Sequence, residues 1–335
     1  MSAVPGAAGA AAVAAIRARH RLRWWEPLPW LAAIAVFFTF PNHLAFGTQL
    51  LVMVLFALSL DLVLGYAGIV TLGHAAFFGA GAYTVGMLAA HAGWNEPLSG
   101  LVAAAVVAGL IGLVSGLVLL RTHGLTLLML TLCTMALIEE GANMGSAWTG
   151  GFDGMPGLSF KAVFGVFAFD PLYFRVQYLY TLAVLLGVFV FVRMLVYSSF
   201  GRSLTGIREN LLRMHAVGAP VRRRQVVAYA ISAALAGIAG GLFTQTNAYV
   251  NLSTLGLDRA AGVLIILILG GYGRLYGAIV GAVVYLMLEH TLARAYPTAW
   301  QLGLGITLMA VALFARNGLI GLGDKFARWL ARRRA

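Results

Sequence analysis

The residues of this chain that could take part in chemistry or recognition lie in a few short segments. The most charged of these is residues 201–225, which contains six arginines and one acidic side chain, Glu209. A Gly218-Ala219-Pro220 sequence interrupts the segment and is expected to end a short helix there. Long apolar stretches flank the segment on both sides, so its charge indicates an exposed loop that another protein contacts.

A second segment, residues 65–86, combines glycines with a histidine at membrane depth. Close helix packing is the plainer interpretation of such small residues, as it is for the pairs Gly112/Gly116, Gly237/Gly241 and Gly277/Gly281. The alternative is a broken helix that lines a solute path, since irregular backbone at this depth is tolerated only against protein or water. Ionisable groups inside a membrane are usually functional. The path candidates are Gly65, Tyr66, Gly68, Gly73, His74, Phe77 and Glu139.

The acidic side chains have simpler interpretations. Asp61 is expected to reach the interface or to cap the turn at Gly65. Glu139 and Glu140 end an apolar segment, and a glycine-rich outer loop follows, in which we single out Gly150, Gly151 and Asp153. A solvated helix end explains the paired acids, and attraction of a solute ammonium or docking of a partner is the alternative.

Several kinds of chemistry are excluded. The two lysines, Lys161 and Lys325, do not lie in a glycine-rich phosphate-binding loop, so the chain is expected not to hydrolyse ATP. No HExxH, CxxC or GxSxG pattern occurs, so no catalytic site, metal or cofactor is expected in the chain. The single cysteine, Cys133, cannot form an intrachain disulfide.

Composition then sets the class of protein. Hydrophobic residues make up 61% of the 335 residues, charged residues 10%, and the mean hydropathy is +0.89, values typical of an integral membrane protein surrounded by lipid. A net charge of +12 would suggest nucleic acid binding in a soluble protein. Here the arginines lie at the ends of apolar segments, as in cytoplasmic loops, so no nucleic acid partner is expected.

The sequence predicts an all-α polytopic membrane protein with about ten transmembrane helices. A crossing needs about 20 residues, so some of the apolar segments are short or broken. The segments are residues 28–40, 44–64, 69–90, 99–120, 124–139, 176–196, 226–250, 260–273, 275–288 and 300–315.

The arginines also predict the orientation. With both termini in the cytoplasm, the outer side carries only Lys161, Arg175, Arg259 and Arg294 of the 23 basic residues. The predicted organisation is a disordered cytoplasmic tail at residues 1–27, a transmembrane domain at 28–315 with the charged cytoplasmic loop 201–225, and a basic tail at 316–335. The first tail is not a secretion signal, because its arginines follow the weakly apolar run.

Several sequence blocks together resemble the LivM-type permease of branched-chain amino-acid ABC importers. The resemblance extends from about residue 44 to residue 315. The blocks are residues 64–68, 72–83, 149–154, 200–202 with 207–210 and 216–218, 232–240, and 269–273 with Gly277.

The resemblance implies an ABC importer permease of the bacterial inner membrane. It implies a second, LivH-like permease, two cytoplasmic ATPases that bind ATP and Mg, and a periplasmic protein that delivers the solute. It also implies that residues 202–218 form a coupling helix docked on one ATPase, with Glu209 and Gly218 as the acid and glycine of the importer loop motif. The coupling residues are Arg202, Ile207, Arg208, Glu209, Ala216 and Gly218.

The solute stays open between several classes. The resemblance favours branched-chain or related amino acids, and the mildly acidic outer loops suit a zwitterion. The family also serves urea, amides and aromatic carboxylates, and Thr126 stands where the family commonly has an aromatic residue. A secondary transporter would share the helices and glycine breaks but would not need the arginine loop. A membrane enzyme would need catalytic pairs that the sequence lacks.

Overall fold

The computed structural model describes residues 26–161, 174–297, 299–314, 318, 319 and 321. The two predicted tails, residues 1–27 and 316–335, therefore lie almost entirely outside the described residues. The chain divides into two compact units, residues 1–41 and residues 42–335. In the first unit the described residues form helix α2, Leu28–Thr39.

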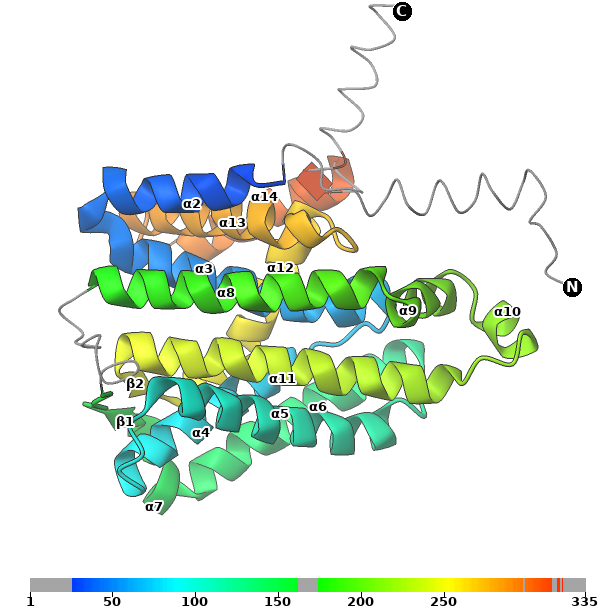
Figure 1. Ribbon diagram of the computed structural model, residues 1–335, viewed down its shortest axis with the longest axis horizontal. Coiled ribbons are helices and arrows are strands. Elements are labelled where there is room, and N and C mark those ends of the chain that lie inside the picture. The colour runs from blue at the N-terminus through cyan, green and yellow to red at the C-terminus, as the bar shows by residue number, and fades with distance from the viewer. Residues whose placement is uncertain (1–25, 162–173, 298, 315–317, 320, 322–335) are drawn as a thin grey trace, which may run out of the picture. The chain divides into compact units, whose positions relative to one another are not determined.

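The second unit is built almost entirely from helices (Figure 1). Its longer helices are α3 Leu44–Asp61, α4 His74–His91, α5 Pro97–Leu119, α6 Gly124–Met144, α8 Phe174–Tyr197, α11 Val221–Asn247, α12 Leu257–Gly270, α13 Leu275–Ala295 and α14 Trp300–Phe314. Its shorter elements are the π-helix η2 Leu62–Tyr66, the helices α7 Ser146–Thr149, α9 Ser199–Glu209 and α10 Leu211–Ala216, the 3₁₀ turns η3 Gly151–Asp153 and η4 Leu252–Thr254, and the strands β1 Met155–Pro156 and β2 Tyr249–Val250. The 3₁₀ turn η1, Pro41–His43, leads into α3.

Seven helical segments among the described residues are long and apolar enough to cross a membrane. They are Pro41–Tyr66, Pro97–Leu119, Gly124–Met144, Phe174–Tyr197, Val221–Asn247, Leu252–Gly270 and Leu275–Ala295. Each of the ten predicted apolar segments overlaps a helix, but α2 and α14, with 12 and 15 residues, are shorter than a crossing requires. Helix α4 is also outside the seven. The orientation with both termini in the cytoplasm stays a prediction.

Helix α3 forms the centre of the second unit. Buried side chains occur on all its sides from Leu51 to Asp61, which is the pattern of a helix enclosed by other helices rather than of one facing lipid. It packs against α8, α11 and α13. The second half of α3, which ends at Asp61, is therefore enclosed by its neighbours.

Glycines bring α11 close to α4 and α5. A Cβ atom added to Gly240 would lie 1.8 Å from the carbonyl oxygen of Phe78, and one added to Gly112 would lie 2.3 Å from the Cβ of Ala233. The same holds for Gly237 against Ala104 and Ala108. The packing interpretation of these glycines is confirmed, because their backbones are in direct contact with another helix.

We expect Gly240→Val to destabilise the protein strongly. The added atoms would overlap the backbone of α4, so the cost should reach the upper end of the about 1–3 kcal/mol typical of overpacking. The measurement is the thermal unfolding midpoint in detergent. Gly187→Ala on α8 is the control, since nothing lies within 4 Å of a Cβ there, and it should unfold at or above the wild-type temperature. Equal midpoints for the two variants would contradict the prediction.

The structure differs from the sequence prediction at the end of α11. A helix was predicted over residues 226–250, but α11 ends at Asn247 because Ala248 adopts a left-handed conformation, with φ 53°. Tyr249 and Val250 then pair antiparallel with Met155 and Pro156. This pairing ties the glycine-rich loop after α7 to the end of α11, which a reading of apolar periodicity does not reveal.

Candidate functional site

The charged loop folds into two short helices, α9 and α10, with distinct caps. The Ser198 hydroxyl accepts a hydrogen bond from the Gly201 amide, 3.4 Å away, and begins α9. The Asn210 side chain accepts one from the Arg213 amide at 2.9 Å and begins α10. Gly218, with φ 78°, follows the end of α10, as the sequence predicted.

Helix α9 is amphipathic and α10 is mostly exposed. Leu204 and Ile207 of α9 are buried, whereas Leu212 is 81% and Val217 76% exposed. Two large apolar side chains that are open to solvent beside many positive charges are typical of a surface that binds another protein.

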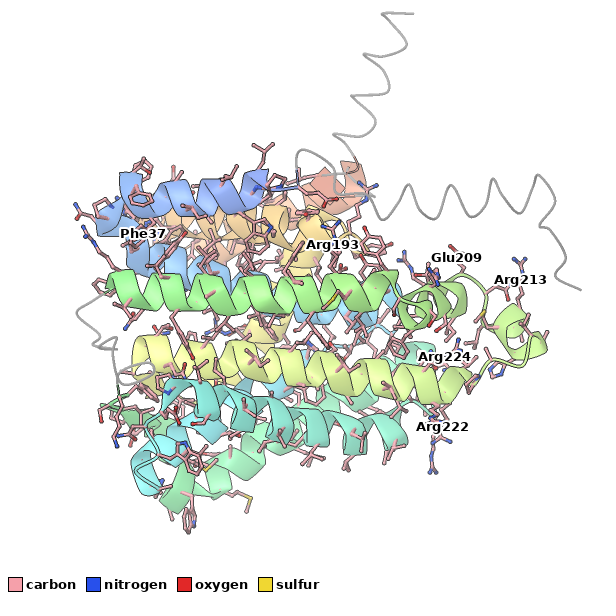
Figure 2. All side chains as sticks on the ribbon, in the orientation of Figure 1. Phe37, Arg193, Glu209, Arg213, Arg222 and Arg224 are labelled. Atoms are coloured by element: carbon pink, nitrogen blue, oxygen red, sulfur yellow. The ribbon has the colours of Figure 1, made fainter. Side chains whose placement is uncertain are left out.

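The charged side chains of residues 201–225 gather at one end of the second unit, on α9, α10 and the start of α11. Figure 2 shows Glu209 there, with Arg213 and Arg222 pointing outward. Of the predicted coupling residues, Ile207 is buried, and the others are exposed: Arg202, Arg208, Glu209, Ala216 and Gly218. The exposed members are therefore placed where a partner could reach them.

Arg208 is different, because its side chain turns toward the membrane helices. Its guanidinium donates a hydrogen bond to the carbonyl oxygen of Gly65 in η2 and lies 5.2 Å from the centre of the Tyr272 ring. Its aliphatic stem passes over Gly68, where an added Cβ would lie 2.9 Å from the Arg208 Cγ. Arg208 thus joins α9 to the segment after α3 and to the turn between α12 and α13. We call the contact of Arg208, Asp61, Gly65, Tyr272 and Gly273 the Arg208 junction.

Asp61 links the same two segments. It is fully buried, and one carboxylate oxygen accepts a hydrogen bond of 2.6 Å from the Gly273 amide. The Arg208 charge attracts the carboxylate. Asp61 was predicted to reach the interface or to cap the turn at Gly65. The structure instead buries it and shows it bound to the turn between α12 and α13. The absence of a side chain at Gly65 allows this approach, because a Cβ there would lie 2.1 Å from the carboxylate oxygen.

The chain is not helical between Ala67 and Gly73, so the first glycine segment contains a break. Gly65 belongs to the Arg208 junction, Gly68 borders it, and Tyr66 is half-buried. Gly73 packs against the backbone of α6, where a Cβ would lie 2.3 Å from the Thr131 carbonyl oxygen. The break therefore serves contacts between segments of this chain.

His74 lies in the interior at the start of α4. It is 1% exposed, stacks on Phe56 with ring centres 5.6 Å apart, and its Nε2 is 2.9 Å from the Ser59 hydroxyl. The Ser59 hydroxyl already donates to the Phe56 carbonyl oxygen at 2.6 Å, so Nε2 is the donor to Ser59. Phe77 is 2% exposed and packs edge-on against Tyr229. In this conformation both side chains pack within the chain.

We therefore expect cysteines at positions 74 and 77 to react slowly with a water-soluble thiol reagent. If these residues lined a solute path, the cysteines would react quickly instead. The background is Cys133→Ala, because the native cysteine is exposed. Gln49→Cys is the control, since that side chain is exposed, and it should be labelled readily. Labelling of His74→Cys as fast as Gln49→Cys in any nucleotide state would restore the path interpretation.

The outer-loop candidates lie at the other end of the helices. Gly150 and Gly151 both adopt left-handed conformations, and the Thr149 hydroxyl donates to the Ala142 carbonyl oxygen at 2.6 Å, so the turn is closed by its own bonds. Asp153 is exposed, and Glu139 is half-buried near Tyr83. No group of three or more metal-binding side chains occurs in the part of the chain that the structure describes.

Sequence reasoning missed Tyr272 and Gly273 as partners of the charged loop. The Leu269–Gly273 block was noticed only as part of a family resemblance. The glycines of this block were the sequence feature that could have indicated a specific turn here. Gly271 has a φ of 100° and Gly273 a φ of 75°, and glycine is favoured in such conformations.

Comparison with known proteins gives consistent matches. The profile of a family described as the permease component of branched-chain amino acid transport systems matches residues 42–313. The high-affinity branched-chain amino acid permease LivM of Escherichia coli K12 is 29% identical, and the match covers 82% of this chain and 69% of the LivM chain. The LivM permease of Salmonella typhimurium is 30% identical, and the match covers 82% of this chain and 69% of that LivM chain. The autoinducer 2 import permease LsrC of Escherichia coli O9:H4 is 28% identical over 70% of this chain and 67% of its own. No solved structure matches.

Proposed function

Because the chain belongs to the family of branched-chain amino acid transport permeases, we propose that it forms half of the translocation path of an ABC importer. It is a multi-pass protein of the bacterial inner membrane. Separate subunits supply the ATPase activity, and the chain itself catalyses no reaction.

The Arg208 junction is the observation that supports coupling to an ATPase. Helix α9 is followed by α10, whose exposed side chains form the proposed docking surface. Arg208, within α9, binds Gly65 in η2. A force applied to α10 would act through Arg208 on the end of α3 and on the turn before α13. Such a connection is what a permease needs if nucleotide-driven movement of a partner is to rearrange its helices.

The partners follow from this role. Two cytoplasmic ATPases bind ATP and Mg, and one of them contacts residues 202–218. A second permease, homologous to this chain, forms the other half of the path, and a periplasmic protein delivers the solute. The outer loop with Gly150, Gly151 and Asp153 is a surface for that delivery protein.

A small amino acid, branched-chain or related, is the leading solute. The LivM relatives, which are permeases of high-affinity branched-chain amino acid transport systems, support it. The LsrC relatives are named for import of autoinducer 2, so a different small solute is the second candidate, together with amides, urea or aromatic carboxylates.

Direct binding to the cognate periplasmic protein tests the solute. Calorimetric titration with leucine, isoleucine, valine, acetamide, urea and benzoate should give heat for the branched-chain amino acids. Binding of benzoate with no binding of any amino acid would overturn this assignment.

A further inference from the structure

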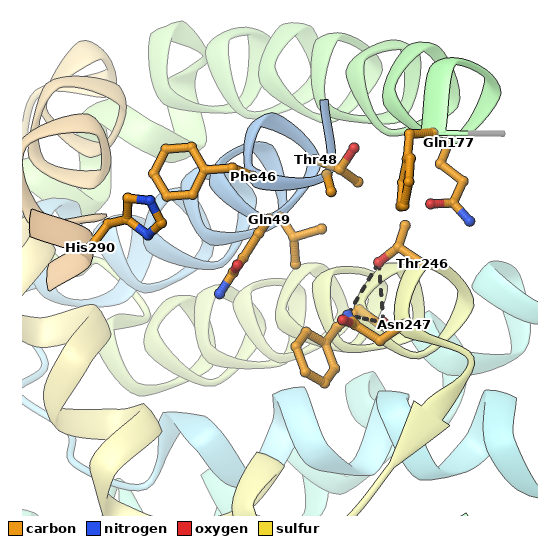
Figure 3. A pocket seen from close by; sticks show the side chains of 11 residues that line it. Phe46, Thr48, Gln49, Gln177, Thr246, Asn247 and His290 are labelled. Atoms are coloured by element: carbon orange, nitrogen blue, oxygen red, sulfur yellow. Dashed lines mark hydrogen bonds between the residues drawn. The ribbon is translucent and has the colours of Figure 1, made fainter. Parts of the chain in front are cut away.

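A cavity of about 310 Å³ lies at the opposite end of the helices from α9 and α10. It lies between the first turns of α3 and α8 and the last turns of α11 and α13, as Figure 3 shows. Its size is at the lower end of the range for small-molecule sites, about 300–1,000 Å³. If α9 and α10 face the cytoplasm, this end faces the side from which solute arrives.

The polar side chains of the cavity are uncharged amides and hydroxyls together with one imidazole. They are Thr48, Gln49, Gln177, Thr246, Asn247 and His290. Gln177 is 2% exposed, and its amide nitrogen has no hydrogen-bond partner among the described residues. A buried donor without a partner is unfavourable, so this amide is poised to bind a ligand or water.

The other lining residues are apolar. Phe46, Phe174 and Phe243 supply aromatic rings, and Val52 adds an aliphatic side chain. The nearby cation, Arg259, lies 4.9 Å from the centre of the Phe243 ring and is attracted by Glu289. Neither charge lines the cavity. The lining therefore combines hydrogen-bonding groups, among them the imidazole of His290, with apolar surface, and it contains no carboxylate, lysine or arginine side chain.

A site exposed to lipid would not have this composition. Gln49, Asn247 and His290 are exposed in the single chain, and amide side chains that face hydrocarbon would be costly. They are therefore expected to face water or another subunit. An opening to water agrees with a route for solute.

We infer that this cavity is a solute-binding site for a small molecule without net charge that has both a hydrogen-bonding group and an apolar portion. The inference rests on the proposed import function and specifies the part of the chain that receives the solute. A zwitterionic amino acid with an apolar side chain satisfies both requirements. A carboxylate with a net negative charge is disfavoured, because no lysine or arginine lines the cavity to balance it.

The test is ATP-driven uptake of labelled L-leucine by proteoliposomes that contain the full importer and its binding protein. Gln177→Leu removes the buried amide at similar volume, and Gln49→Leu alters an exposed lining residue that packing does not require. Thr181→Val is the matched control: Thr181 is fully buried one turn further along α8, and its hydroxyl also lacks a partner among the described residues, but it does not line the cavity.

We expect uptake about tenfold slower for both glutamine variants, as for the loss of one hydrogen bond to solute, and wild-type uptake for Thr181→Val. Wild-type rates in both glutamine variants, with normal leucine uptake by the unaltered importer, would overturn the inference but leave the proposed function standing. Uptake of benzoate in place of leucine would contradict the inferred absence of net charge. If the unaltered importer moved none of the candidate solutes with ATP (leucine, isoleucine, valine, acetamide, urea and benzoate), the proposed function would fail and the inference with it.

Discussion

Arg208→Glu should abolish ATP-driven uptake while the protein remains inserted in the membrane. The substitution removes the hydrogen bond to Gly65 and the contact with the Tyr272 ring, and it places a second carboxylate near Asp61. Hydrogen bonds to charged groups contribute about 1.5–3 kcal/mol, which corresponds to a change of about ten- to a hundredfold in an equilibrium. Because this junction connects α9 to two other segments, we expect the loss to appear in coupling.

The measurement is solute uptake together with solute-stimulated ATP hydrolysis in the same proteoliposomes. Arg223→Glu is the control, since it makes the same charge change at an exposed position on the first turn of α11, and it should retain most uptake. Arg208→Lys keeps the charge but not the planar group that spans Gly65 and Tyr272, so it should be intermediate. Equal activity of the Arg208→Glu and Arg223→Glu variants would refute the role of the junction.

The second large effect is expected at Gly218, where Gly218→Trp should uncouple the ATPases from transport. No atom of the described residues lies within 4 Å of a Cβ at this position, and the residue is exposed. A bulky side chain there would meet a partner and not this chain. Glu209→Arg, at the end of α9, should act in the same direction by reversing the charge on the docking surface.

Gly218→Ala separates the two possible causes of a defect at this position. The φ of 78° strains any residue with a Cβ, at a cost of about 1–2 kcal/mol, and alanine and tryptophan share this cost. Uptake should therefore survive in the alanine variant and be lost in the tryptophan variant. If both variants are equally impaired, backbone strain explains the loss and the docking surface is not at Gly218.

The helices could be predicted because burial in lipid requires long apolar segments, and these are visible in a sequence. Gly112 and Gly237 are each followed by a second glycine four residues later, and this pattern likewise indicated close helix packing. The structure confirms close contacts at both glycines. Helix α4 shows the limit of this approach, because its apolar character is diluted by glycine and histidine, and it does not reach the hydropathy of the seven crossing segments.

The contacts of the site could not be predicted in the same way. Arg208 and Gly65 are 143 residues apart, and Asp61 and Gly273 are 212 apart. Neither pair shares a helix or a periodic pattern, so only the packing of three segments brings them together. The cavity beside Gln177 was missed for the same reason: its lining comes from four helices, and no single segment carries a motif for it.

We propose that the α9–α10 segment couples this permease to separate ATPases. The most direct measurement compares leucine uptake by two preparations. Proteoliposomes that contain the complete importer receive ATP or a nonhydrolysable analogue, and liposomes that contain only this chain and its permease partner receive an imposed proton gradient. We expect uptake only with ATP and the ATPases present, and we expect it to be lost in the Arg208→Glu variant. Uptake driven by the proton gradient without the ATPases would show a secondary transporter and would contradict the proposed coupling.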